Sequence, residues 1–197
     1  MLTATYSIVA MSVEQSSVRT SVHALHQLVH GTFEPEEALS PRQVDYACEA
    51  MQRLYDAFGW RKVEQFLIPA LRKVTRAADR LLEELDRVKL AAADTMGALF
   101  ERVRNYGVES PAQVQHFCSE ADAFCNALLT RLEREERELF PIARAALSSE
   151  AWFAIANQII VRERDRPAPA APFLMRPTPE AAAPPGEEHA RVPQPVH

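Results

Sequence analysis

The chain has 197 residues, of which 47% are hydrophobic and 25% are charged. This composition supports a folded core and excludes a chain that is disordered throughout. The formal net charge of -5 is ordinary for a globular protein and argues against a nucleic-acid partner, which usually requires a basic surface. No apolar stretch approaches the roughly 20 residues that a membrane-spanning helix needs, so we expect no membrane partner either.

The three cysteines, Cys48, Cys118 and Cys125, predict free thiols rather than disulfides. Cys118 and Cys125 are seven residues apart, which is about 10.5 Å along a helix. A disulfide tolerates at most roughly 7 Å between Cα atoms. The opening residues contain neither a basic nor a long apolar stretch and predict no secretory signal. We therefore expect a reducing compartment, the cytoplasm, and thiol sensing at an exposed Cys48 stays open as a minor alternative.

Apolar residues between about 12 and 161 recur at intervals of three and four, which predicts an all-α fold without strands. We expect helices at residues 12–30, 41–66, 70–104 and 111–146, followed by a short helix at 150–161. These elements form one predicted domain, residues 12–161, preceded by a flexible N-terminus at residues 1–11. Nine of the fourteen prolines follow residue 166, so residues 162–197 are predicted to be a disordered tail.

Two of the predicted helices begin with similar sequences. Residues 40–44 read SPRQV and residues 110–114 read SPAQV. In each, serine is a typical N-cap, proline suits the first helical position, and glutamine completes a capping box. About 30 residues later, each helix reaches a leucine- and phenylalanine-containing segment that ends in proline, at 66–69 and 138–141. The repeat predicts two helical hairpins of similar plan, and thus an up-down-up-down four-helix bundle with a short C-terminal helix.

Three segments resemble helices of the hemerythrin-like (HHE cation-binding) domain family. Residues 23–28 (HALHQL) resemble its first helix, residues 62–69 (KVEQFLIP) its second, and residues 132–141 (LEREERELFP) its last. The likeness covers roughly residues 15 to 150. It implies a four-helix bundle whose di-iron site takes histidines from all four helices together with bridging carboxylates.

The resemblance places the family's metal-site positions at six residues: His23, Trp60, Glu64, Ala78, Arg131 and Glu135. His23, Glu64 and Glu135 keep ligating side chains, whereas the other three stand where the family has histidines. Indole and guanidinium groups only donate hydrogen bonds, so neither ligates a metal. The resemblance therefore implies a degenerate site and no cofactor. The alternative is iron held by a reduced set of His23, Glu64 and Glu135.

Arg131 offers a replacement for the missing metal. It lies four residues before Glu135, on the same helix face, and Glu64 is expected on a facing helix. We hypothesise that Arg131 neutralises both carboxylates inside the bundle and that Trp60 fills the remaining volume. The competing interpretation is an ordinary solvent-exposed pair of Arg131 and Glu135. We favour the buried arrangement because the family's equivalent positions point inward.

His23, His26 and His30 are spaced to share one helix face. One interpretation is a weak zinc or iron site completed by a carboxylate. The other, which we favour, is a set of surface contacts near the end of the helix. His116 and Glu120, four residues apart, are interpreted as a surface or core-edge pair.

The sequence contains no recognisable catalytic motif. A glycine-rich phosphate loop and a GxSxG nucleophile motif are both absent. We therefore predict a non-enzymatic protein, a regulatory or protein-interaction module with an unidentified protein partner, which the proline-rich tail would help to bind. The alternative is an iron-binding oxygen or nitric oxide carrier or sensor.

Overall fold

The fold was analysed in a computed structural model, which describes residues 2–165. Throughout this range the chain forms helices and turns without any strand, so the all-α prediction is confirmed there. The predicted disordered tail, residues 162–197, begins inside a helix that continues to Arg164. The rest of that tail lies outside the described residues.

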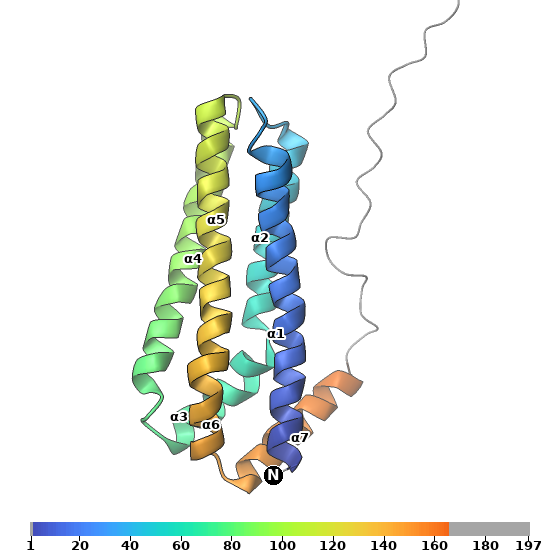
Figure 1. The fold of residues 1–197 in the computed structure, drawn as a ribbon, viewed down its shortest axis with the longest axis vertical. Helices are drawn as coiled ribbons and strands as arrows, with labels where there is room; N and C mark the ends of the chain where they lie inside the picture. The colour runs from blue at the N-terminus through green and yellow to red at the C-terminus, as the bar shows by residue number, and fades with distance from the viewer. Residues whose placement is uncertain (1, 166–197) are drawn as a thin grey trace, which may run out of the picture.

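Four long helices lie side by side along the long axis of the molecule (Figure 1). They are α1 (Leu2–Leu28), α2 (Pro41–Gly59), α4 (Asp79–Tyr106) and α5 (Pro111–Arg134). Helix α1 packs against α2 and α5, and α4 packs against the same two helices. The shorter helices α3 (Ile68–Val74), α6 (Phe140–Ala146) and α7 (Ser149–Arg164) gather at the end that holds the N-terminus. None of the helices among residues 2–165 combines the length and apolar character needed to cross a membrane.

Both predicted serine caps are confirmed. The Ser40 side chain accepts a hydrogen bond from the backbone N–H of Gln43, and the Gln43 side chain accepts one from the Ser40 N–H, which completes a capping box. Ser110 accepts from the Gln113 N–H in the same way. The Gln113 side chain, however, accepts from the N–H of Glu109, one residue further back. Local side-chain chemistry therefore sets both helix starts, with a small difference between them.

A π-helical turn precedes each of the two proline-containing short helices. Segment η2 (Val63–Leu67) leads into α3, and η3 (Glu135–Leu139) leads from α5 into α6. Pro69 and Pro141 lie just after these turns. Because proline has no N–H and its ring crowds the carbonyl four residues back, a locally widened turn accommodates it without ending the helix. The repeat seen in the sequence is therefore present in the structure.

The N-terminal prediction is wrong for the described part of residues 1–11. Helix α1 begins at Leu2, and both Ile8 and Met11 are buried in a core cluster that includes residues of α7. The apolar face of this early segment is covered because α7 folds back onto α1. The sequence interpretation placed the helix start at residue 12 and missed this packing. The last helix, predicted at 150–161, is correspondingly longer at both ends.

Two of the predicted long helices are interrupted. Helix α2 ends at Gly59 rather than at residue 66, and Trp60 and Arg61 lie in a turn. The predicted helix at 70–104 is broken after Val74, where Thr75 adopts an extended conformation and its hydroxyl accepts a hydrogen bond from the Ala77 N–H. A short hydroxyl-to-backbone bond of this kind competes with the helix and favours a turn.

A further segment, η1 (Val29–Phe33), ends α1 in another π turn.

The buried apolar residues form two clusters. One cluster is built from α1, α2, α4 and α5, and the other from the segments around α3, α6 and α7. Along α1 and along α5–α6, buried polar residues fall between the two clusters: Gln15, Arg131 and Glu135. The hydrophobic interior is therefore divided by a buried polar layer, which also contains Arg61.

Candidate functional site: a buried cluster of charges

Glu135 lies at the centre of the polar layer and is completely buried. Arg61 binds it through two N–H groups, with Nη1 at 2.6 Å from Oε2 and Nη2 at 2.8 Å from Oε1. Arg131 Nε donates to Oε1 at 3.0 Å, and Gln15 Nε2 donates to Oε2 at 2.7 Å. Each carboxylate oxygen thus accepts two hydrogen bonds. A buried charge is tolerated only when it is paired and hydrogen-bonded in this way.

Arg131 bridges the two acidic residues as the sequence predicted. Its side chain is fully buried, and Nη2 donates a hydrogen bond to Glu64 Oε1 while Nε donates to Glu135. Nη1 donates to the backbone carbonyl of Leu85 on α4 at 2.6 Å. The buried interpretation of Arg131 is therefore confirmed, and the solvent-exposed pair is not what forms. Arg61 Nη2 lies 3.5 Å from Glu64 Oε1 and Lys89 Nζ lies 3.9 Å from Glu64 Oε2, so two further positive charges lie near Glu64.

Arg61 was missed by the sequence interpretation. It lies in the turn between α2 and η2 and is 1% exposed. Its Nε donates to the Phe58 carbonyl at 3.1 Å, and its guanidinium carbon lies 3.6 Å from the centre of the Phe58 ring. The backbone carbonyl and the aromatic face therefore orient the guanidinium toward Glu135. The sequence does contain a signal for Arg61. It lies three residues before Glu64, and Arg131 lies four residues before Glu135, so each acidic residue has an arginine at a spacing that permits pairing.

The predicted interior position of Trp60 is wrong. Its side chain is 66% exposed, and its carbonyl accepts a hydrogen bond from Arg162 of α7. The reason is the end of α2 at Gly59, since the turn that follows directs Trp60 outward and Arg61 inward. Arg61 therefore occupies the volume that the sequence interpretation assigned to the indole.

Gln15 was also missed. It occurs where α1 presents Ile8, Met11, Val22 and Leu25 to the interior, and its position fits that spacing of three and four. A polar residue within an apolar stripe signals a buried polar partner. Its amide oxygen is buried and has no hydrogen-bond partner among residues 2–165. Gln15 thus serves the cluster through its NH₂ group alone.

The charges of the cluster balance, because two guanidinium groups face Glu64 and Glu135, and at its edge Lys89 adds a positive charge and Asp86 a negative one. Burial alone raises the pKa of Glu135, but the charge and hydrogen bonds of Arg61, and then those of Arg131, outweigh it. The pKa of Glu135 is therefore held below its ordinary value, and the group stays ionised at neutral pH. Ionic hydrogen bonding, rather than proton transfer, is what this arrangement supports.

The cluster does not fit a di-iron site. The Glu135 oxygens already accept four hydrogen bonds, and the guanidinium groups of Arg61 and Arg131 place positive charge where a cation would bind. Ala78 is buried at the N-terminus of α4, and its methyl group has no donor atom. His23 is exposed on α1, eight residues beyond Gln15, which is about 12 Å along the helix axis. The structure does not assemble His23 with Glu64 and Glu135.

The three thiols show no feature of a reactive cysteine. All three cysteines are free; Cys118 and Cys125 are buried and Cys48 is half-buried. Burial, and then the charge of Asp45, raises the pKa of Cys48 to about 11. Reactive cysteines have lowered rather than raised pKa values, so the structure does not support thiol sensing at Cys48.

No protein-family model matches the chain, and no curated protein matches it.

Proposed function

We propose that the protein is a hemerythrin-like, up-down-up-down four-helix bundle in which a salt-bridge cluster replaces the di-iron site. It is non-enzymatic and acts in the cytoplasm as a regulatory or protein-interaction module. The observation that carries this proposal is the occupation of the interior by Arg61 and Arg131, both hydrogen-bonded to Glu135. Where the resembled family needs imidazole nitrogens, this chain has hydrogen-bond donors.

The cluster has a structural role in this proposal. Its hydrogen bonds join α1 through Gln15, the turn after α2 through Arg61, η2 through Glu64, and α4 through the Leu85 carbonyl. All of these bonds converge on the segment that holds Arg131 and Glu135. Directional bonds between charged groups fix the relative position of helices more strictly than apolar packing alone. Oxygen or nitric oxide chemistry would require ligands that this layer does not offer.

An apolar surface stripe on α1 supports the interaction role. Leu2, Tyr6, Val9 and Val13 follow one another at intervals of four, three and four, so they share one helix face. All four side chains are exposed. A contiguous apolar face on the surface is typical of a protein-contact site. We propose that this stripe receives an apolar helix face of a protein partner.

Iron content of the purified full-length protein tests the replacement of the metal site. The protein is incubated anaerobically with Fe²⁺, exposed to air, desalted, and measured for iron and for charge-transfer absorption. The experiment uses the Asp122→Asn variant, because Asp122 lies on α5 beside His26 and His30, away from the charge cluster, and iron bound by that group must not be counted. We expect no retained iron and no visible band. Two irons per chain with charge-transfer bands would overturn the proposal.

Site-specific photo-crosslinking tests the interaction role. A photo-reactive residue at Val13 should give one defined crosslinked species in the cells that produce the protein. The same residue at Leu90, an exposed leucine on α4, is the matched control and should give none. A second substitution, Val9→Glu, should abolish the Val13 product. Equal products from both positions, or a Val13 product that survives Val9→Glu, would contradict the role of the stripe.

A further inference from the structure

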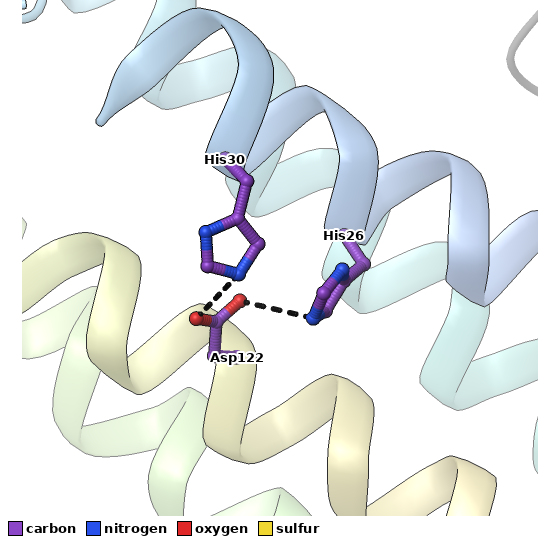
Figure 2. A group of neighbouring side chains, drawn as sticks. All are labelled: His26, His30 and Asp122. Carbon is purple, nitrogen blue, oxygen red and sulfur yellow. Dashed lines mark ion pairs between the residues drawn. The ribbon is translucent and has the colours of Figure 1, made fainter. Parts of the chain in front are cut away.

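Two histidines and one aspartate converge where the C-terminal part of α1 meets α5 (Figure 2). His26 belongs to α1, His30 to η1, and Asp122 to α5. One donor atom from each residue lies within 4.8 Å of the other two. His30 Nε2 is 2.9 Å from Asp122 Oδ2, and His26 Nε2 is 3.7 Å from Asp122 Oδ1. Both histidines thus direct the same ring nitrogen toward one carboxylate.

The helix geometry holds this arrangement in place. His26 and His30 are four residues apart, and their ring centres are 4.5 Å apart. Side chains at this spacing project from one face of a helix. Asp122 has a side chain that is only 22% exposed. Its Oδ1 atom is buried and accepts no hydrogen bond from any residue in the described range. This oxygen therefore faces His26 Nε2 at 3.7 Å without a hydrogen bond, and the two imidazoles supply positive charge to Asp122 only when they are protonated.

We propose that His26, His30 and Asp122 form a binding site for a divalent transition-metal ion of the zinc class. Imidazole nitrogen and carboxylate oxygen are the ligands that Zn²⁺ accepts alongside thiolate. Metal–ligand bonds of about 2.0–2.2 Å in a tetrahedron separate neighbouring donor atoms by about 3.3–3.6 Å. The observed separations of 2.9 and 3.7 Å lie close to this range on either side. The two separations run to different oxygens of Asp122, and the three donor atoms lie within 4.8 Å of one another, so side-chain rotation has to bring them together around one ion.

Glu34 supplies the outer support that such sites usually have. Its Oε2 atom lies 2.8 Å from Nδ1 of His30. When Nδ1–H donates to this carboxylate, the lone pair of Nε2 faces Asp122 and is available to the metal. Metal-ligating histidines commonly bond a carboxylate through the second ring nitrogen, which fixes the tautomer and the ring orientation. The chain therefore provides three ligands and one supporting acid, and water takes the fourth position because both histidines are partly exposed.

The inferred site is separate from the buried charge cluster. Asp122 and Glu135 are 13 residues apart in sequence, which corresponds to about 20 Å along the helical segment. The two groups share no residue. A bound ion would join α1 to α5 near the end of α1. The inference does not depend on the loss of the di-iron site.

Zinc titration of the full-length protein tests the inference. The apparent dissociation constant is measured by competition with a chromophoric chelator, with Zn²⁺ as the only added metal. We expect one ion per chain. Asp122→Asn and His26→Ala should each weaken binding about tenfold or more, since loss of a mere supporting partner already costs about 10- to 100-fold. Glu34→Gln should weaken binding by about 10- to 100-fold, because Glu34 only supports His30 and does not bind the ion itself.

His23→Ala and His116→Ala are the matched controls. His23 is exposed on α1, one turn before His26, and belongs to no such group in the described chain. His116 pairs with Glu120 on α5 at 3.9 Å, and so represents an isolated histidine–carboxylate pair. Both variants should keep the wild-type affinity.

Co²⁺ substitution gives a second readout that does not depend on affinity alone. The wild type should show visible d–d bands of a four-coordinate ion, and Asp122→Asn should not. Circular dichroism confirms that each variant is folded. Absence of saturable zinc binding, or equal weakening by His23→Ala and His26→Ala, would overturn the inference.

Discussion

Replacement of Arg131 by methionine tests the buried cluster most directly. Methionine keeps much of the volume but removes the charge and the three hydrogen bonds to Glu64, Glu135 and the Leu85 carbonyl. Removal of one partner from a buried ion pair typically costs about 3–5 kcal/mol, because the remaining charge is left unpaired. Glu135 keeps its bonds to Arg61 and Gln15. We therefore expect a loss near the lower limit, about 3 kcal/mol.

Urea unfolding, followed by helical circular dichroism, measures this loss. With a slope of about 2 kcal/mol per molar urea, a loss of 3 kcal/mol moves the midpoint down by about 1.5 M. Arg134→Met is the control, because Arg134 is also on α5 but forms partly exposed ion pairs with Glu84 and Glu138. Its effect should stay below about 1 kcal/mol. A loss below about 1 kcal/mol for Arg131→Met would refute the structural role of the cluster.

Three further predictions concern the contacts of Glu135 and the burial of the thiols. Because the folded-state pKa of Glu135 is lowered, its stabilisation is present above the unfolded value of about 4.3 and is lost as pH falls below it. The urea midpoint of unfolding, measured at decreasing pH, should fall in this range. About 1 M salt is added to screen the exposed ion pairs. In Glu135→Gln the fall in the midpoint should be smaller. Burial raises the pKa values of Cys48 and Cys118 to about 11 and that of Cys125 to about 12. Disulfide reagents should therefore label the native protein slowly at pH 7.5. After unfolding, the same reagents should label all three thiols. Gln15→Leu removes one hydrogen bond to Glu135. We expect the free energy of unfolding, measured in urea, to fall by about 1–2 kcal/mol. An unchanged midpoint would show that this hydrogen bond does not stabilise the fold.

Features encoded by short-range chemistry were predictable from the sequence. The serine caps at Ser40 and Ser110 and the apolar periodicity depend on neighbours within one or two turns. The pairing of Arg131 with Glu64 and Glu135 was also predictable. It rested on the same-face spacing of Arg131 and Glu135 and on the family resemblance, which implied that these positions point inward and that Glu64 lies on a facing helix.

Features that depend on distant packing were not predictable in the same way. The inward position of Arg61 depends on the end of α2 at Gly59, and a continuous helix through residue 66 places Trp60 there instead. The helical start at Leu2 depends on α7, which is remote in sequence but packs against α1. Asp122 meets His26 and His30 only because α1 lies beside α5. In each case the missing information was a contact between elements rather than a local propensity.

The buried cluster and the inferred metal site connect the α1–η1 segment with the α5–η3 segment at two levels about 20 Å apart. Gln15–Glu135 forms the first connection, and His26 and His30 with Asp122 form the second. Effects of sites farther apart than about 10 Å and without shared partners usually add. Saturating Zn²⁺ should therefore raise the melting temperature of Arg131→Met and of the wild type by a similar increment. A much smaller rise in the melting temperature of Arg131→Met would mean that the cluster also holds α1 in the position that brings His30 to Asp122. Metal binding would then depend on the buried charge cluster.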